Sequence, residues 1–257
     1  QYEPAASENT VQPNMEISTG MTGTTTAWST GYTGAGMRIA IIDTGLDTSH
    51  QSFDNGAYEY ALEQNAARAK ESVEAYKASL DLLDADEINE KLSLLHIKEG
   101  VSAADLYRTE KVAYGYCYID KDLDVTHETD TEGEHGSHVA GIAAANRYLP
   151  DGNGGYVSAL DSVHMHGAAP DAQVLVMKVF GDEGGAYDSD YTAAIEDAIV
   201  LGADTINLSL GSASPGPSKA RTEAYQKIFD DLENASSVVT VSSGNAGYWA
   251  KNADPIG

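Results

Sequence analysis

The sequence is poor in cysteine and in positive charge. Cys117 is its single cysteine, so the chain cannot form an internal disulfide. Lys and Arg number 15 against 40 Asp and Glu, and the formal net charge is −25. A surface of this sign repels nucleic acid and anionic membranes, which argues against both as partners. It suits a soluble, exposed or secreted enzyme.

The lone thiol has two interpretations. A single cysteine can serve as a catalytic nucleophile. Tyr114, Tyr116 and Tyr118 surround Cys117 in a pattern typical of an aromatic strand, and free cysteines are among the most buried residues. We therefore expect a buried thiol without a role in catalysis.

Long apolar runs and two familiar catalytic motifs are also missing. No stretch approaches the roughly 20 apolar residues that cross a bilayer, so the sequence predicts no membrane-spanning segment. It contains neither a Gly-x-Ser-x-Gly nucleophile elbow nor a His-Glu-x-x-His zinc motif. Hydrolytic chemistry of those two kinds is therefore not predicted.

Apolar runs and helical segments alternate along most of the chain. Residues 37–43 are a short apolar run that ends in a carboxylate, which is typical of a buried parallel strand. Further strands are expected at 173–180, 204–210 and 237–243, and helices at 138–146, 191–201 and 219–233. This alternation predicts an α/β fold with a doubly wound parallel sheet, whose functional residues gather at the carboxyl ends of the strands.

Residues 57–110 have a different composition. Ala, Glu, Leu, Lys and Asp dominate there, and proline is absent. Apolar residues approximate helical spacing at Leu80, Leu83, Ile88, Leu92 and Leu95. We interpret 57–110 as a mostly helical, acidic insertion within one domain that spans 1–257. Whether this insertion only decorates the surface or contacts substrate stays open.

Three reactive side chains lie at the ends of predicted elements. Asp43 closes the first strand, His135 precedes a helix of small residues, and Asn245 follows the last strand. A carboxylate can orient an imidazole that removes the proton of a nucleophile, and an Asn amide can donate a hydrogen bond to an oxyanion. Each of the three is commonly structural when it occurs alone, but their order and placement predict a hydrolytic site.

Four segments carry a family resemblance. Residues 41–47 (IIDTGLD) and 135–142 (HGSHVAGI) resemble the segments around the catalytic Asp and His of subtilases, with a Ser where Thr is commoner. Residues 206–211 (INLSLG) resemble the substrate-binding strand of that family, and 242–247 (SSGNAG) its oxyanion segment. The long interval between the first two segments is similar to that of the large cell-envelope subtilases of Gram-positive bacteria.

This resemblance implies a subtilisin-like serine endopeptidase, secreted or held at the bacterial cell surface, that acts on protein or peptide substrates. Asp43 would orient His135, and His135 would act first as general base and then as general acid. Asn245 would donate a hydrogen bond to the oxyanion.

The resemblance also implies a cleft that binds an extended substrate between two backbone edges. Ser209, Leu210 and Gly211 would line the primary specificity pocket, and Gly184 would lie on the opposite edge.

The family's nucleophile segment, Gly-Thr-Ser-Met-Ala, does not occur in the sequence. We expect a C-terminal fragment of the same precursor, separated by internal cleavage, to supply the serine. Without that fragment, strands 173–180 and 237–243 are expected to lack cover on at least one face. The alternative is a catalytically silent module that uses the same cleft to bind peptides.

The chemistry itself requires no cofactor. Asp120, Asp122 and Asp124 resemble the start of a calcium loop, but Val125 stands where an EF-hand needs glycine. A looser site for structural calcium therefore stays open. His164–Gly167 is interpreted as a surface turn, and no metal ligand is assigned.

Overall fold

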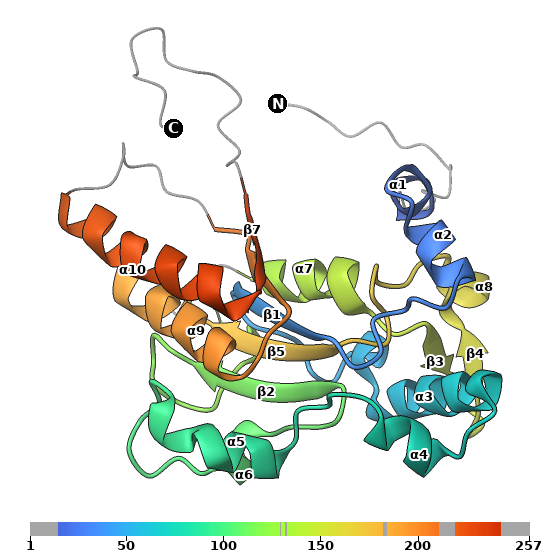
Figure 1. Ribbon diagram of the computed structural model, residues 1–257. Helices are drawn as coiled ribbons and strands as arrows, with labels where there is room; N and C mark the ends of the chain where they lie inside the picture. The colour runs from blue at the N-terminus through green and yellow to red at the C-terminus, as the bar shows by residue number, and fades with distance from the viewer. Residues whose placement is uncertain (1–14, 129, 132, 182–183, 211–218, 243–257) are drawn as a thin grey trace, which may run out of the picture.

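A parallel sheet forms the centre of the molecule (Figure 1). The computed structural model describes residues 15–128, 130–131, 133–181, 184–210 and 219–242. Five strands pair in the order β2-β5-β1-β6-β7, and every pairing is parallel. The strands are β1 Arg38–Asp43, β2 Val112–Cys117, β5 Gln173–Lys178, β6 Thr205–Leu208 and β7 Val238–Val241. The predicted α/β fold with a parallel sheet is confirmed.

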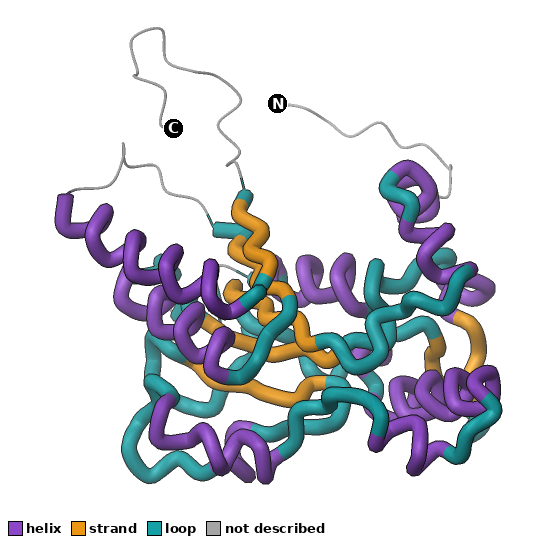
Figure 2. The backbone as a smooth tube through the Cα atoms, viewed as in Figure 1, coloured by secondary structure: helices purple, strands orange, loops and turns teal. Residues whose placement is uncertain are grey.

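Helices cover both faces of this sheet (Figures 1 and 2). Alternate side chains of β1 enter two separate apolar clusters because successive strand residues point to opposite faces. Ile41 packs in the cluster that contains Ala140 of α7 (His135–Ala144), and Ile42 packs in the cluster that contains Ile195 of α9 (Asp188–Val200). This double cover explains why β1, β2 and β5 are buried at every position.

The expectation that residues 173–180 lack cover is wrong, because helices on both sides bury all six residues of β5. The expectation holds for β7 at the sheet edge, where Val238 and Val241 are 61% and 67% exposed. Next to it, α10 (Lys219–Ala235) packs against α9. Among the described residues, no helix combines the length and the apolar character that a bilayer crossing requires.

Several short elements had no clear pattern in the sequence. They are α1 Met15–Met21, α2 Thr24–Ser29, the antiparallel hairpin of β3 Tyr148–Pro150 with β4 Tyr156–Ser158, and α8 Ala159–Val163. Trp28 anchors α2, since its indole N–H donates to the Ala168 carbonyl at 2.9 Å and its ring centroid lies 4.1 Å from that of His166. The predicted surface turn at 164–167 is therefore wrong for His166, which is 6% exposed.

The segment between β1 and β2 is largely helical. It contains η1 Gln51–Phe53, α3 Asn55–Ala69, α4 Val73–Ala78, α5 Ala85–Lys91, η2 Leu92–Leu94 and α6 Ala103–Leu106. The side chains of Asp54, Ser72 and Asp84 accept hydrogen bonds from the first turns of α3, α4 and α5, which explains where these helices begin. Leu80 and Leu83 lie between helices, so the predicted apolar spacing does not mark one continuous helix.

Two polar contacts fix this segment to the amino-terminal ends of the strands. The buried Arg38 guanidinium pairs with both carboxylate oxygens of Glu87, each at 2.8 Å, and with Asp81. The Gln173 amide exchanges two hydrogen bonds with the backbone of Leu83. Because Asp43 lies at the carboxyl end of β1, these anchors hold α5 at the edge of the sheet opposite the predicted site.

A further anchor joins the segment to α9. Asp197 is completely buried on α9 and accepts hydrogen bonds from the backbone N–H of His96 and from the Tyr118 hydroxyl, the latter at 2.8 Å. The His96 Nδ1 lies 2.8 Å from Asp197 Oδ1, and its Nε2 lies 3.2 Å from a carboxylate oxygen of Glu196. The residues that follow η2 are thus held to α9 by the imidazole of His96, which lies between Asp197 and Glu196.

Candidate active site

The structure brings Asp43 and His135 into direct contact. Asp43 is the last residue of β1 and His135 is the first residue of α7, and Nδ1 of the imidazole lies 2.8 Å from Oδ1 of the carboxylate. The Asp43 side chain is 1% exposed, whereas that of His135 is 53% exposed. An ionised carboxylate only accepts hydrogen bonds, so Nδ1 carries the proton and the Nε2 lone pair is left available as a base.

Two glycines allow the start of α7 to approach the end of β1 this closely. A Cβ atom on Gly136 would lie 2.3 Å from the Gly45 carbonyl oxygen and 3.2 Å from Cβ of Asp43. Gly45 has φ +108°, and a Cβ there would lie 2.4 Å from the Val125 carbonyl oxygen. Larger residues at these positions would push His135 away from Asp43, since neither backbone contact can yield.

Thr44 joins the two segments. Its hydroxyl donates to the Gly133 carbonyl at 3.0 Å and accepts from the backbone N–H of Gly136 at 2.9 Å. Its own N–H donates to Asp43 Oδ1 at 2.7 Å. In the sequence, only its place directly after Asp43 marks this residue.

Ser137 makes a second connection, which the sequence also did not reveal. Its hydroxyl oxygen accepts from the backbone N–H of Asp47 at 2.7 Å and lies 2.8 Å from Nε2 of His127. A hydroxyl group has one proton and two lone pairs, so Ser137 can bond His127 while it accepts from Asp47. The first turn of α7 is therefore tied both to the loop after β1 and to the loop that precedes the helix.

This geometry coincides with a family match over most of the chain. Residues 34–257 match the subtilase family. The chain belongs to the subtilase family. The four segments that resemble subtilases thus lie in a chain of that family, which is one of serine proteases and has the α/β fold described above.

Relatives of this subtilase are large bacterial proteases. The minor extracellular protease Vpr of Bacillus subtilis (strain 168) is 29% identical over 246 residues, which are 94% of this chain and 22% of that protein. The PII-type proteinase of Lacticaseibacillus paracasei is 29% identical over 84% of this chain and 10% of its own length. The C5a peptidase of Streptococcus pyogenes serotype M3 is 28% identical over 87% of this chain and 16% of its own length. The chain spans less than a quarter of each of these relatives.

The other residues that the subtilase resemblance selects lie partly within the described structure. Ile41 of β1 pairs with Asn207 of β6, and Ser209 follows the carboxyl end of β6, at the edge of the sheet where Asp43 ends β1. The Leu210 carbonyl accepts a hydrogen bond from the Ser242 hydroxyl at 2.6 Å.

Gly184 follows β5 with φ +78°, and its N–H donates to the Gly181 carbonyl at 2.9 Å. Gly211 and Asn245 lie outside the described residues. The substrate-binding and oxyanion assignments of this subtilase therefore stay predictions.

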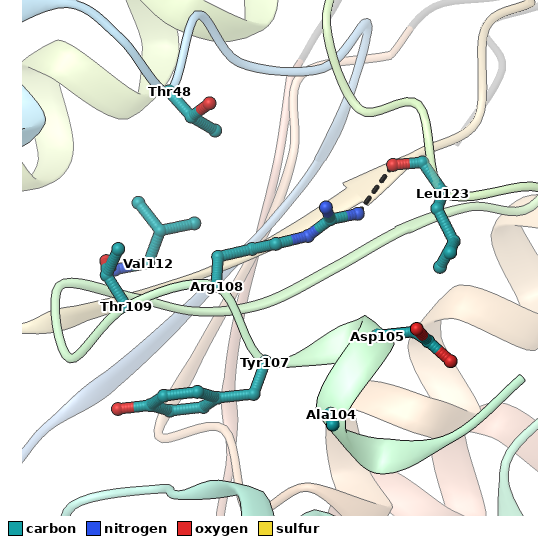
Figure 3. A pocket seen from close by; sticks show the side chains of 8 residues that line it. All are labelled: Thr48, Ala104, Asp105, Tyr107, Arg108, Thr109, Val112 and Leu123. Carbon is teal, nitrogen blue, oxygen red and sulfur yellow. Dashed lines mark hydrogen bonds between the residues drawn. The ribbon is translucent and has the colours of Figure 1, made fainter.

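A cavity of about 490 Å³ lies elsewhere in the molecule (Figure 3). It is lined by Thr48 from the loop after β1, by Val112, by Leu123 and by residues 104, 105 and 107–109. Figure 3 shows the Arg108 side chain directed across this space, where its guanidinium donates to the Leu123 carbonyl at 2.5 Å. Of the predicted catalytic and substrate-binding residues that the structure describes, none lines this cavity.

The acidic loop at 120–124 binds its own backbone. Asp122 Oδ1 accepts from the N–H of Asp124, and Asp124 Oδ1 accepts from the N–H and hydroxyl of Thr126. Within the part of the chain that the structure describes, no three His, Cys, Asp or Glu side chains form a group suited to a metal ion.

Cys117 is buried at the carboxyl end of β2, as expected. Burial raises the pKa of its thiol to about 12. The thiol stays protonated near neutral pH, so it is not the nucleophile of this subtilase.

Proposed function

We propose that this chain supplies the aspartate and the histidine of an Asp-His-Ser triad in a serine endopeptidase. The observation that carries the proposal is the 2.8 Å contact between a buried Asp43 carboxylate and a half-exposed His135 imidazole. Asp43 holds the Nδ1–H tautomer and stabilises the imidazolium. Nε2 of His135 removes the proton of the serine as it attacks the scissile carbonyl, and later donates it to the leaving amine.

The serine of this proposed triad comes from polypeptide that is not part of the 257 residues. The absence of a Gly-Thr-Ser-Met-Ala segment supports this, and so does the exposed edge strand β7. Val238 and Val241 are apolar and uncovered there, and soluble proteins protect such edges. We propose that a C-terminal fragment of the same precursor carries the serine and binds to this chain without a covalent link. Intact and denaturing mass spectrometry of the native protein tests it, since one mass under both conditions contradicts a separate fragment.

The proposed substrates are proteins or peptides bound in an extended conformation. The carboxyl end of β6, which leads to Ser209, Leu210 and Gly211, supports this because it lies at the edge of the sheet where Asp43 ends β1. Gly184 would form the opposite edge of the cleft, and Asn245 would bind the oxyanion. One of the relatives is an extracellular protease, which supports a secreted or cell-surface location. Culture fractionation measures that location directly.

A serine-directed fluorophosphonate probe and a peptide substrate together test the proposed activity in the complete protein. We expect probe labelling of the unmodified protein, and loss of both labelling and hydrolysis in a His135→Ala variant. A protein that binds peptides but neither reacts with the probe nor hydrolyses any of them contradicts the proposal, and it identifies a silent peptide-binding module.

The chemistry needs no cofactor under this proposal. Structural calcium stays a prediction. Thermal unfolding of the complete protein with calcium and with excess chelator checks it, and identical unfolding temperatures contradict it.

A further inference from the structure

A buried lysine stands beside Asp43 in the sheet. Lys178 is the last residue of β5, and it pairs with Asp43 of β1 on one side and with Cys117 of β2 on the other. Paired residues of parallel strands point to the same face, so the Lys178 side chain lies on the α7 face together with that of Asp43. An ammonium group at such a position is unfavourable unless it is paired and hydrogen-bonded.

The partners of Lys178 all come from the segment between β2 and α7. Its Nζ lies 2.6 Å from Asp130 Oδ2 and donates to the Thr126 carbonyl at 2.8 Å. Both charged side chains are only 2% exposed. Burial by itself lowers the pKa of Lys178, but the hydrogen bond and the charge of Asp130 outweigh this effect and hold that pKa above its usual value. The ammonium is therefore charged at neutral pH.

This ion pair acts on the piece of chain that leads into His135. Asp130 precedes His135 by a few residues, and Gly133 between them accepts a hydrogen bond from Thr44. The last residues before His135 are thus held at two points, both on strands that end at the same edge of the sheet. One of these points is β5 through Lys178, and the other is the end of β1.

We propose that Lys178 and Asp130 are positioning residues for His135, because their buried ion pair holds the segment that places the imidazole against Asp43. The inference rests on the proposed function and extends it to groups that do not touch the substrate. A misplacement of about 1 Å in a catalytic group can cost about 100-fold in rate. An ion pair with this role affects kcat far more than substrate binding.

A second ion pair, in which the arginine is buried and the glutamate is 26% exposed, provides a control in the neighbouring strand. Arg38 begins β1 and pairs with Glu87, at the edge of the sheet opposite Asp43. Loss of the Arg38–Glu87 pair is expected to lower stability, because this pair anchors the insertion. The pair does not contact the segment before His135. Comparison of the two pairs therefore separates positioning of the base from general support of the fold.

The experiment compares Lys178→Met, Asp130→Asn, Lys178→Arg and the control Glu87→Gln in the complete protein. We expect kcat for a peptide substrate to fall about 100-fold in the first two variants, with KM changed less than about 2-fold. Lys178→Arg keeps the charge and is expected to restore kcat to within about 10-fold of the unmodified protein. The control is expected to change kcat less than about 2-fold.

Hydrogen exchange measured by mass spectrometry supplies a readout that needs no activity. We expect faster exchange in peptides covering 118–144 for Lys178→Met and Asp130→Asn, and unchanged exchange in peptides of β1. Unchanged exchange in 118–144, or a kcat near that of the control, overturns the inference. If the unmodified protein hydrolyses no peptide, the proposed function fails instead, and the exchange data alone decide whether the ion pair holds the segment.

Discussion

Two aspartate–histidine pairs in this molecule look almost identical by distance. In both, Nδ1 of the imidazole lies 2.8 Å from a carboxylate oxygen, between Asp43 and His135 in one pair and between Asp197 and His96 in the other. The carboxylates are 1% and 0% exposed, and the imidazoles are 53% and 47% exposed. Neither the distance nor the burial distinguishes a proposed catalytic pair from a structural one.

The other side of each imidazole makes the difference. His96 Nε2 lies 3.2 Å from Glu196 and its Nδ1 lies 2.8 Å from Asp197, so both ring nitrogens contact carboxylates. The His96 backbone N–H also donates to Asp197. Among the described residues, His135 Nε2 has no hydrogen-bond partner. A base needs an accessible lone pair, and only His135 retains one.

The largest expected effect tests this contrast directly. His135→Ala is expected to reduce kcat of the complete protein by several orders of magnitude, because triad members act as a unit. His96→Ala removes an imidazole of equal exposure and is expected to leave kcat within about 3-fold. Peptide hydrolysis by both purified variants measures this. Similar losses in the two variants would remove the distinction between the pairs.

Substitutions of the two carboxylates are expected to differ nearly as much in their effect on kcat. Asp43→Asn presents an amide to Nδ1 and favours the wrong imidazole tautomer, for which a loss of about 10⁴ in kcat is expected. Asp197→Asn keeps the shape of a buried side chain that anchors the insertion to α9, and kcat is expected to stay within about 3-fold of that of the unmodified protein. Single-turnover kinetics at a fixed pH make the comparison, and an Asp43→Asn variant of normal rate contradicts the assignment.

For stability, we expect the substitution in the His96 pair to have the larger effect, the reverse of the order expected for kcat. Asp197→Ala leaves Tyr118 and the His96 backbone N–H without their acceptor, and we expect it to lower the free energy of unfolding by about 3 kcal/mol. Asp43→Ala leaves one backbone N–H, that of Thr44, without its acceptor, while its imidazole partner reaches water, so we expect a smaller cost of about 1 kcal/mol. Urea unfolding measures both, and equal costs would show that Asp197 is no stronger an anchor.

A buried charge without a carboxylate in contact provides the smallest and most selective test. Lys111 is completely buried, donates to the carbonyls of Pro170 and Ala172, and lies 5.2 Å from the Tyr58 ring centroid. Burial lowers the pKa of Lys111 to about 7.

The folded-state pKa of Lys111 is thus below its unfolded value, so the unfolded chain binds more protons between pH 7 and 10. Lys111 therefore makes the free energy of unfolding rise with pH, by at most about 1.4 kcal/mol per unit, and this stability is lost as pH falls toward 7. Lys111→Met is expected to remove that slope. Urea unfolding of both proteins at pH 7, 8 and 9 measures it, and parallel pH profiles contradict the prediction.

Much of the fold was predictable because its signals are local. Strand 37–43 and helix 219–233 differ from β1 and α10 by one or two residues, since apolar runs and helical spacing mark buried strands and covered helices directly. The hairpin of β3 and β4 was not predictable, because strands of three residues are too short for a pattern to develop. Of the single apolar pattern assigned to 80–95, only 85–94 is helical, because 80–84 form the connection between α4 and α5.

The sequence by itself determined the parallel sheet and the meeting of Asp43 with His135. One residue ends a strand and the other begins a helix, and in a doubly wound fold such ends converge at the carboxyl edge of the sheet. Only the tertiary structure decided that His96 is held by acidic residues on both sides and that Lys178 pairs with Asp130. These are contacts between common residue types far apart in the chain, so no local spacing encodes them, and only packing of the finished fold brings the side chains together.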